Sequence, residues 1–217
     1  MIPKIVKTVS PNFRAKRDEL FRRLYGDLIA HGCTILDIGG EPYYWEKSLG
    51  SHAEFYRSCK ITLLNPKQQQ ANLPNIICVA GDATDMREFA DQSFDLVLSN
   101  AVIEHVGDFE QQRKMANNVQ RVGRYYFLHS ANYYFPIEPH SFFPFFNQLP
   151  LFMQYGIARV WPGQTHIPDF SPKSLEYIRT KVRLLKWREV KELFPRAKIE
   201  KEKLWGLNKS FIVHNAP

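Results

Sequence analysis

Glycines and polar residues stand where four apolar segments of the sequence end. In chain order these residues are Asp37 with Gly39 and Gly40, Asn65, Gly81 with Asp82, and Asn100, which Ala101 follows. If the segments are neighbouring parallel strands, their carboxyl ends meet at one edge of a sheet, where open α/β sheets bind ligands. Glycines at such an edge let the backbone approach a ligand closely. This set of groups suits a nucleoside ligand with an adenine, a ribose and a charged tail.

The elements that position these residues follow from hydrophobic periodicity. Near-continuous apolar runs at 33–39, 60–65, 75–82, 93–100 and 124–131 predict strands buried on both faces. Helical patterns fit between them at 44–58, 83–90 and 107–121, and another predicts an N-terminal helix at 15–30. Alternation of strands and helices indicates an α/β fold with a doubly wound, mostly parallel sheet.

The end of the chain has a different pattern. A helix that begins near Trp187 is closed by Pro195, and two strand-like runs then flank a turn expected at Gly206, Leu207 and Asn208. This spacing favours a C-terminal antiparallel hairpin. No linker separates two units, so residues 1–217 are predicted to form a single domain.

Residues 132–180 form a long aromatic-rich insertion with few charges. A segment of this length outside the sheet is usually a functional lid or a binding element. We therefore expect residues 132–180 to cover or bind a substrate.

Three sequence motifs carry a resemblance to a known family. The segments TILDIGG, GDATDM and FDLVLSNAVIEHV resemble the first, third and fourth motifs of class I, Rossmann-like S-adenosylmethionine-dependent methyltransferases, in the same order. The likeness extends over roughly residues 30–131 by motif and 186–215 by pattern. It implies a Rossmann-like fold, S-adenosylmethionine as the cofactor and methyl transfer as the reaction.

The resemblance also implies roles for the residues at the strand ends. Asp37, Gly39 and Gly40 would hold the methionine part of the cofactor, and Asp82 and Ala83 the adenine. The remaining implied cofactor residues are Asn65 at the ribose position, Asn100 and Ala101 beside the methionine part, and His105 at the pocket. Asp and Asn also cap helices and form turns, and His105 also suits a helix start, so purely structural roles remain an alternative.

Two departures from the family pattern bear on activity. The first loop lacks the third glycine and continues as Glu41-Pro42, and the neutral Asn65 replaces the usual acid. A non-catalytic methyltransferase-like binding protein is therefore an alternative. A nicotinamide-dependent oxidoreductase is disfavoured, because the chain lacks Gly-x-Gly-x-x-Gly after the first strand.

Candidate catalytic residues lie in the insertion. The stretch 132–150 resembles a segment that follows the fifth strand in a subset of bacterial methyltransferases, and its ionisable side chains are Glu138 and His140. His140 is predicted as a general base, because its unperturbed pKa lies near neutrality, with Glu138 orienting it. The alternative is that both residues order the loop.

The expected acceptor is a small, fairly apolar or neutral molecule under the aromatic insertion. A nucleic-acid or protein acceptor is the alternative; nucleic acid is disfavoured because the insertion offers almost no Lys or Arg for phosphates.

Cys33, Cys59 and Cys78 lack the spacing of a zinc site, so no metal is expected. The chain has no apolar run long enough for a membrane span and no signal-peptide pattern, which predicts a cytoplasmic protein. The sequence indicates neither the oligomeric state nor whether oxygen, nitrogen or carbon is methylated.

Overall fold

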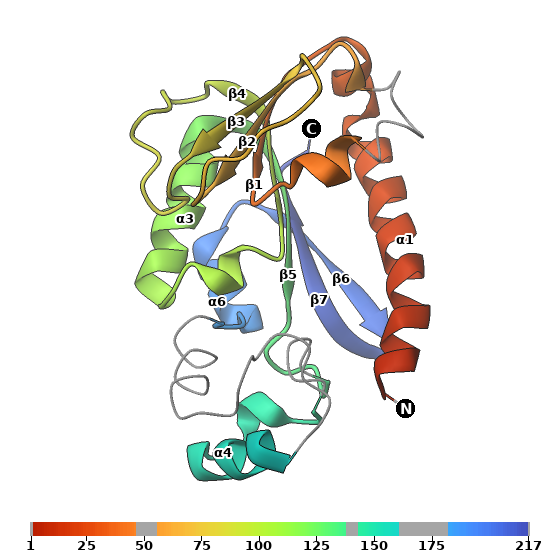
Figure 1. Ribbon diagram of the computed structural model, residues 1–217. Helices are drawn as coiled ribbons and strands as arrows, with labels where there is room; N and C mark the ends of the chain where they lie inside the picture. The colour runs from red at the N-terminus through yellow and green to blue at the C-terminus, as the bar shows by residue number, and fades with distance from the viewer. Residues whose placement is uncertain (1, 47–55, 138–142, 161–181, 217) are drawn as a thin grey trace.

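Seven strands form one mixed sheet in the order β3-β2-β1-β4-β5-β7-β6 (Figure 1). The computed structural model describes residues 2–46, 56–137, 143–160 and 182–216. The strands are β1 (Thr34–Ile38), β2 (Lys60–Asn65), β3 (Ile76–Ala80), β4 (Phe94–Asn100), β5 (Gly123–Ala131), β6 (Lys198–Leu204) and β7 (Leu207–His214). Strands β1 to β5 are parallel, whereas β7 runs antiparallel to β5 and β6 antiparallel to β7. The predicted doubly wound sheet with a C-terminal hairpin is confirmed.

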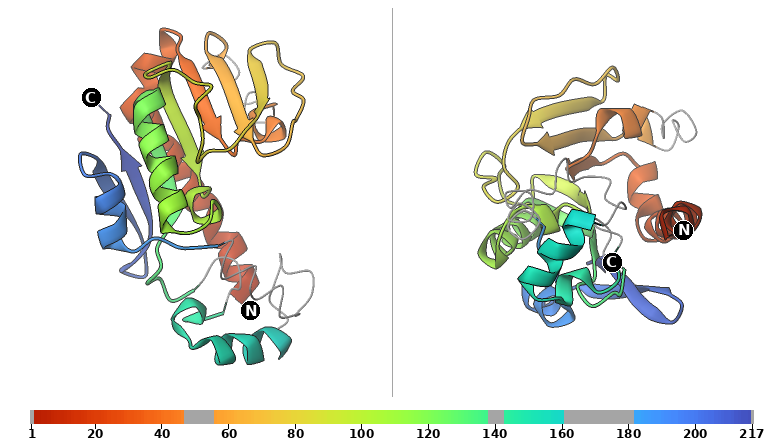
Figure 2. Two further views of the ribbon diagram at one scale, coloured as in Figure 1. Left: turned by 90° about the vertical axis from the view of Figure 1, so that its left-hand side faces the viewer. Right: turned by 60° about the horizontal axis from the view of Figure 1, so that its bottom comes forward.

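Helices cover both faces of this sheet (Figures 1 and 2). Helix α1 (Ile2–Ala30) covers one face, and α3 (Phe109–Val122) and α6 (Trp187–Leu193) cover the other. Helix α4 (Leu151–Val160) lies beyond the end of β5 (Figure 1), and η1 (Ile103–His105) and η2 (Phe146–Gln148) are short 3-10 helices. Residues 42–46 are also helical. One buried cluster joins α1 to the sheet, and a second joins α3 and α6 to the opposite face.

The N-terminal helix is longer than the predicted 15–30, since it begins at Ile2. Its apolar stripe packs on the sheet through Phe21, Tyr25 and Ile29, which are all buried. The Tyr25 hydroxyl donates to the carbonyl oxygen of Tyr126 in β5 at 2.8 Å, so its buried polar atom is satisfied. This contact fixes α1 against the middle of the sheet.

The predicted helix at 83–90 is wrong, because this segment forms turns. The Asp82 side chain accepts from the Thr84 backbone N–H at 2.8 Å, and the Asp82 carbonyl accepts from that of Asp85 at 2.9 Å. Side-chain bonds of this kind compete with helix formation. Arg121 of α3 donates to the carbonyl oxygens of Met86 and Phe89, which holds this turn segment against α3.

The C-terminal hairpin turns earlier than the sequence predicted. Its two-residue loop is Trp205 and Gly206, with φ of 53° and 80°. Positive φ at both loop positions is typical of the tight turns that match the twist of a hairpin.

The expected helix at 107–121 is confirmed as α3, with Asp108 as its N-cap.

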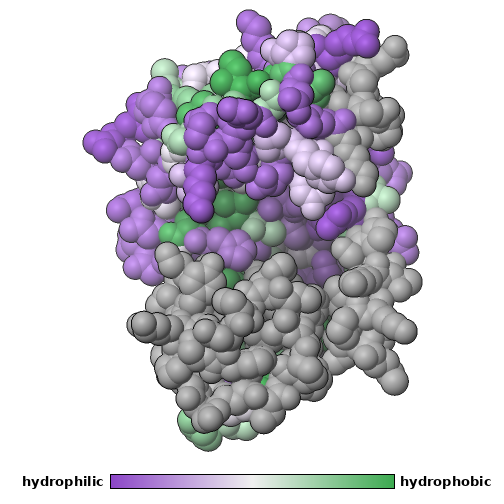
Figure 3. Space-filling view, in the orientation of Figure 1, coloured by the Kyte–Doolittle hydropathy of each residue, from purple (hydrophilic) through white to green (hydrophobic). Residues whose placement is uncertain are grey.

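The described parts of the insertion lie beyond the end of β5, where η2 and α4 form (Figure 1). Phe135 and Phe146 are buried there, whereas Tyr134, Phe145 and Phe152 are exposed. On the face seen in Figure 3, hydrophilic residues cover most of the described surface and smaller hydrophobic patches lie between them. Within the described ranges, no helix has the length and apolar character to cross a membrane.

Candidate active site

The centre of the sheet is a topological switch point. Strand β1 pairs with β2 on one side and with β4 on the other, so the chain leaves β1 and β4 in opposite directions. The register places Ile38 opposite Ser99, which brings Gly39 and Asn100 to the same edge. Ligands of open α/β sheets bind at this kind of crevice. We call this part of the molecule the switch-point edge; it comprises Asp37, Gly39, Gly40, Asn65, Asp82, Ala83, Asn100 and Ala101.

The two glycines of the switch-point edge have specific steric roles. Gly39 has φ +75°, and a Cβ there would lie 2.5 Å from Val102 Cγ2. At Gly40 a Cβ would lie 2.1 Å from Asp37 Oδ2, closer than real contacts allow. The absence of a side chain at Gly40 therefore leaves space for the Asp37 carboxylate and keeps it accessible.

Asp37 is a half-buried carboxylate held by one described side chain. Its Oδ2 accepts from the Trp45 indole N–H at 2.8 Å, a contact that the sequence analysis did not foresee. Burial raises the pKa of Asp37 to about 7, although the Trp45 hydrogen bond acts in the opposite direction. Among the described residues no cation pairs with this carboxylate. A cationic ligand at this position would supply the missing partner.

Asn65, at the end of β2, supports the loop that contains Gly39 and Gly40, which we call the glycine loop. Its side-chain amide donates to the Gly40 carbonyl at 2.7 Å and to Gln69 Oε1 at 3.1 Å. Gln69 in turn donates to Glu41 Oε2 at 2.9 Å. Because both amide hydrogens have protein partners, only the Asn65 oxygen remains for a ligand. Gln69 therefore belongs to this part of the site, although no motif in the sequence marked it.

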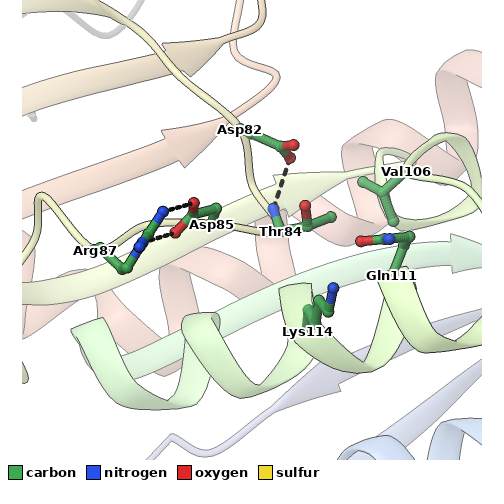
Figure 4. A pocket seen from close by; sticks show the side chains of 7 residues that line it. All are labelled: Asp82, Thr84, Asp85, Arg87, Val106, Gln111 and Lys114. Carbon is green, nitrogen blue, oxygen red and sulfur yellow. Dashed lines mark hydrogen bonds and ion pairs between the residues drawn. The ribbon is translucent and has the colours of Figure 1, made fainter.

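Asp82 stands beside an open pocket of about 700 Å³ (Figure 4). The pocket is lined by Asp82, Thr84, Asp85, Arg87, Val106, Gln111 and Lys114. Figure 4 shows the turn after β3 on one side and the start of α3 on the other, with Asp85 and Arg87 forming a bidentate ion pair. Asp82 itself is exposed, whereas Ala83 is buried. A planar group bound here would contact the turn after β3 and the segment after β4 together.

The chain leaves β4 through a constrained backbone. Ala101 has φ 57°, which non-glycine residues rarely adopt, and its N–H donates to the His129 carbonyl at 2.8 Å. Strained residues of this kind cluster at functional sites. The buried Gln112 of α3 holds the following η1 helix by donating to the Ile103 carbonyl at 2.9 Å. His105 lies at the end of η1 and is exposed.

A second cavity, of about 130 Å³, shares Ala101 with the switch-point edge. We call it the β5–β7 cavity; its lining residues are Ala101, Glu104, His129, Ala131, Asn132, Phe135, Ile137, Lys209 and Ser210. The sequence analysis missed His129, Lys209 and Ser210, because they come from the two partner strands β5 and β7 and belong to no motif. Their antiparallel register, with Ala131 opposite Ser210, brings them together.

A buried charge cluster lies beside the β5–β7 cavity. The Glu202 carboxylate contacts Arg17 of α1 at 3.2 Å and His129 Nε2 at 3.3 Å, and it accepts from the Ser210 hydroxyl. Burial lowers the pKa of His129 to about 4 despite Glu202, so the ring is neutral at pH 7. Burial opposes ionisation of Glu202, but His129, Arg17 and Ser210 hold its pKa at about 2. The cluster ties α1 to the C-terminal hairpin.

The structure thus brings together the predicted residues of the switch-point edge. His105 lies at the exposed end of η1, and its role at the pocket stays a prediction. The predicted catalytic residues Glu138 and His140 lie outside the described residues. Their assignment stays a prediction.

Comparisons with known proteins agree with this geometry. A family model described as a methyltransferase domain matches residues 54–127, which include Asn65, Asp82 and Asn100. A magnesium protoporphyrin IX methyltransferase from Synechocystis PCC 6803, solved with bound SAH, superposes with a TM-score of 0.54 at 11% identity. The match covers 97% of this chain and 85% of that one. The N-methyltransferase NodS from Bradyrhizobium japonicum WM9 gives 0.51 at 14% identity, over 94% and 95%. At these identities the structural likeness establishes the fold. A search of curated proteins found no match.

Proposed function

Because this chain carries a methyltransferase domain of the class I, S-adenosylmethionine-dependent family, we infer that it methylates a small molecule held in the β5–β7 cavity. One observation carries the inference. The switch-point edge, with its two glycines and a carboxylate that pairs with no cation among the described residues, adjoins a small cavity through Ala101. A donor site and an acceptor site are therefore adjacent, as a transfer reaction requires.

The residues of the switch-point edge fit the cofactor. The Asp37 carboxylate favours the cationic amino group, and Gly40 leaves that carboxylate uncovered. We assign the adenine to the pocket between Asp82 and Val106, with Ala83 beside it. Asn100 and Ala101 line the methionine part, and Asn65 keeps the glycine loop in place while offering its oxygen to the ribose.

The protein's contribution to catalysis is mainly alignment. The cofactor supplies a sulfonium whose methyl group is already activated toward a nucleophile. The chain then has to hold the acceptor atom in line and exclude water, which the buried Phe135 and Ala101 do at the cavity wall. His140 as proton acceptor and Glu138 as its positioning residue remain part of the proposal.

The dimensions of the β5–β7 cavity support a small acceptor over a macromolecule. A cavity of about 150 Å³ accommodates a benzene-sized ring, and the volume here is about 130 Å³. Its wall includes the buried Phe135. A nucleotide held in a polymer would need a wider opening and phosphate contacts.

Isothermal titration calorimetry of the purified protein tests the proposed function. We expect micromolar binding of S-adenosylmethionine and S-adenosylhomocysteine and no binding of NADH, which serves as the control ligand. Absence of binding by both adenosyl compounds would refute the cofactor assignment. Binding of NADH alone would indicate a nicotinamide-dependent oxidoreductase instead of a methyltransferase.

A further inference from the structure

Lys209, one of the residues that line the β5–β7 cavity, carries an ammonium group with incomplete charge compensation. Lys209 of β7 is half-buried and lines the cavity. Its Nζ lies 4.6 Å from the centre of the Phe13 ring, and among the described residues no carboxylate oxygen lies within ion-pair distance of it. A half-buried cation whose side-chain contact among the described residues is an aromatic ring is electrostatically suited to bind an anion.

Glu202, the buried carboxylate whose charge acts on Lys209, already contacts other groups through its Oε2 atom. Glu202 contacts Arg17 and His129 and accepts from Ser210, so one anion serves several donors. Burial lowers the pKa of Lys209, although the charge of Glu202 opposes this change. His129 adds no positive charge at pH 7, because its pKa lies near 4. The uncompensated charge at this wall of the cavity is therefore that of Lys209.

The wall that borders the switch-point edge has a different character. It contains Ala101 and Glu104, which directly follow β4. Glu104 is buried, and its Oε2 accepts from the Ser130 hydroxyl at 3.2 Å. A carboxylate there suits a hydroxyl or amine group, which can donate a hydrogen bond to it. Phe135 and Ile137 supply an apolar surface for the body of the molecule.

We propose that the β5–β7 cavity selects a small acceptor that carries a carboxylate at one end and a hydroxyl or amine at the other. Lys209 binds the carboxylate, and Ala101 and Glu104 hold the methyl-accepting end at the switch-point edge. This proposal rests on the proposed function for the identity of the reacting end. The charge preference of the cavity itself can be measured separately from catalysis.

Three probes of equal ring size separate charge from shape: benzoate, benzyl alcohol and benzylamine. Their affinities are measured by ligand-observed NMR, with and without saturating S-adenosylhomocysteine. We expect benzoate to bind at least about tenfold more tightly than benzylamine, with benzyl alcohol between them. Equal affinities, or a preference for benzylamine, would overturn the proposal.

Variants locate the effect in the cavity. Lys209→Met is expected to remove the preference for benzoate, whereas Lys203→Met, at an exposed position of the same hairpin, should keep it. Ala131→Leu extends a side chain into the cavity and should weaken all three probes. Retention of the benzoate preference in Lys209→Met, or unchanged affinity for all three probes in Ala131→Leu, would place the anion site elsewhere and refute the assignment.

Cofactor titration distinguishes the two hypotheses. If the Lys209→Met and Ala131→Leu variants bind S-adenosylhomocysteine as tightly as the wild type does, they are folded. Their affinities for the three probes can then be interpreted. If the wild type binds benzoate selectively but no adenosyl compound, the proposed function fails and the anion site stands. If it binds the adenosyl compound but shows no charge preference, this inference fails alone.

Discussion

The switch-point edge and the β5–β7 cavity are neighbours, yet they are assembled in different ways. The edge is built from short motifs in which chemistry and backbone shape are encoded together, as in Asp37 beside Gly39 and Gly40. The cavity is built from single residues of η1, β5, β7 and the segments that follow β4 and β5, which the sheet register and tertiary packing bring together. The difference separates a proposed donor site, made largely by local sequence, from a proposed acceptor site, made by tertiary packing.

Removing the negative charge of the edge should have the largest effect. Asp37→Asn keeps the size of the side chain and an oxygen that can accept from Trp45. Loss of one partner of a desolvated charge pair costs several kcal/mol, so we expect roughly a hundredfold weaker binding of S-adenosylhomocysteine in calorimetry at pH 8. An affinity within threefold of wild type would contradict the role of Asp37.

The same variant should gain stability, which distinguishes a functional carboxylate from a structural one. Between the ordinary pKa of about 3.8 and the folded-state pKa of about 7, the native protein retains a proton that the unfolded chain releases. The free energy of unfolding therefore falls progressively from pH 4 to pH 7, because Asp37 ionises in the unfolded chain first. Above pH 7 the loss is complete. We expect Asp37→Asn to raise Tm by roughly 3 °C at pH 8 and by little at pH 4, measured by scanning calorimetry. A lower Tm at pH 8 would show that the carboxylate is structural.

A side chain at Gly40 should displace the Asp37 carboxylate. Overpacking costs about 1–3 kcal/mol, so Gly40→Ala is expected to weaken S-adenosylhomocysteine binding by roughly 10- to 100-fold. Gly26→Ala is the matched control, because nothing lies within 4 Å of a Cβ at this position in α1. That control should bind normally and be slightly more stable. Equal affinity of the two variants would remove the steric role assigned to Gly40.

Cofactor affinity should depend on pH through Asp37. Only the ionised carboxylate pairs with an ammonium group, so affinity is expected to be flat from pH 7.5 to 8.5. Below pH 7 it should fall about tenfold per unit, since the pKa of Asp37 is about 7. Calorimetry at pH 5.5, 6.5, 7.5 and 8.5 measures this curve. Asp37→Asn should flatten it, and a pH-independent wild type would contradict the ion pair.

Asn65 offers a smaller and less obvious test. Asn65→Asp introduces the acid that the resembling family prefers, but a carboxylate cannot donate to the Gly40 carbonyl. Loss of such hydrogen bonds is worth about 1 kcal/mol, so we expect a roughly fivefold weaker affinity for S-adenosylhomocysteine. Tighter binding by Asn65→Asp would show that ribose recognition outweighs support of the glycine loop.

The sequence analysis succeeded where structure is local. Apolar runs predicted the strands, and Asp37, Asp82 and Asn100 could be placed at one edge because parallel strands end together. The predicted helix at 83–90 failed because the segment forms turns that tertiary contacts, such as those of Arg121 with the Met86 and Phe89 carbonyls, hold in place. Trp45, His129 and Lys209 were missed because their partners are set by packing, which no motif encodes.

The most direct test of the account is a crystal structure of the protein with S-adenosylhomocysteine. The account predicts that the amino group of the ligand contacts the Asp37 carboxylate and that its adenine lies between Asp82 and Val106. A ligand with its amino-acid end away from Asp37 and Gly40 would contradict the central assignment of the switch-point edge.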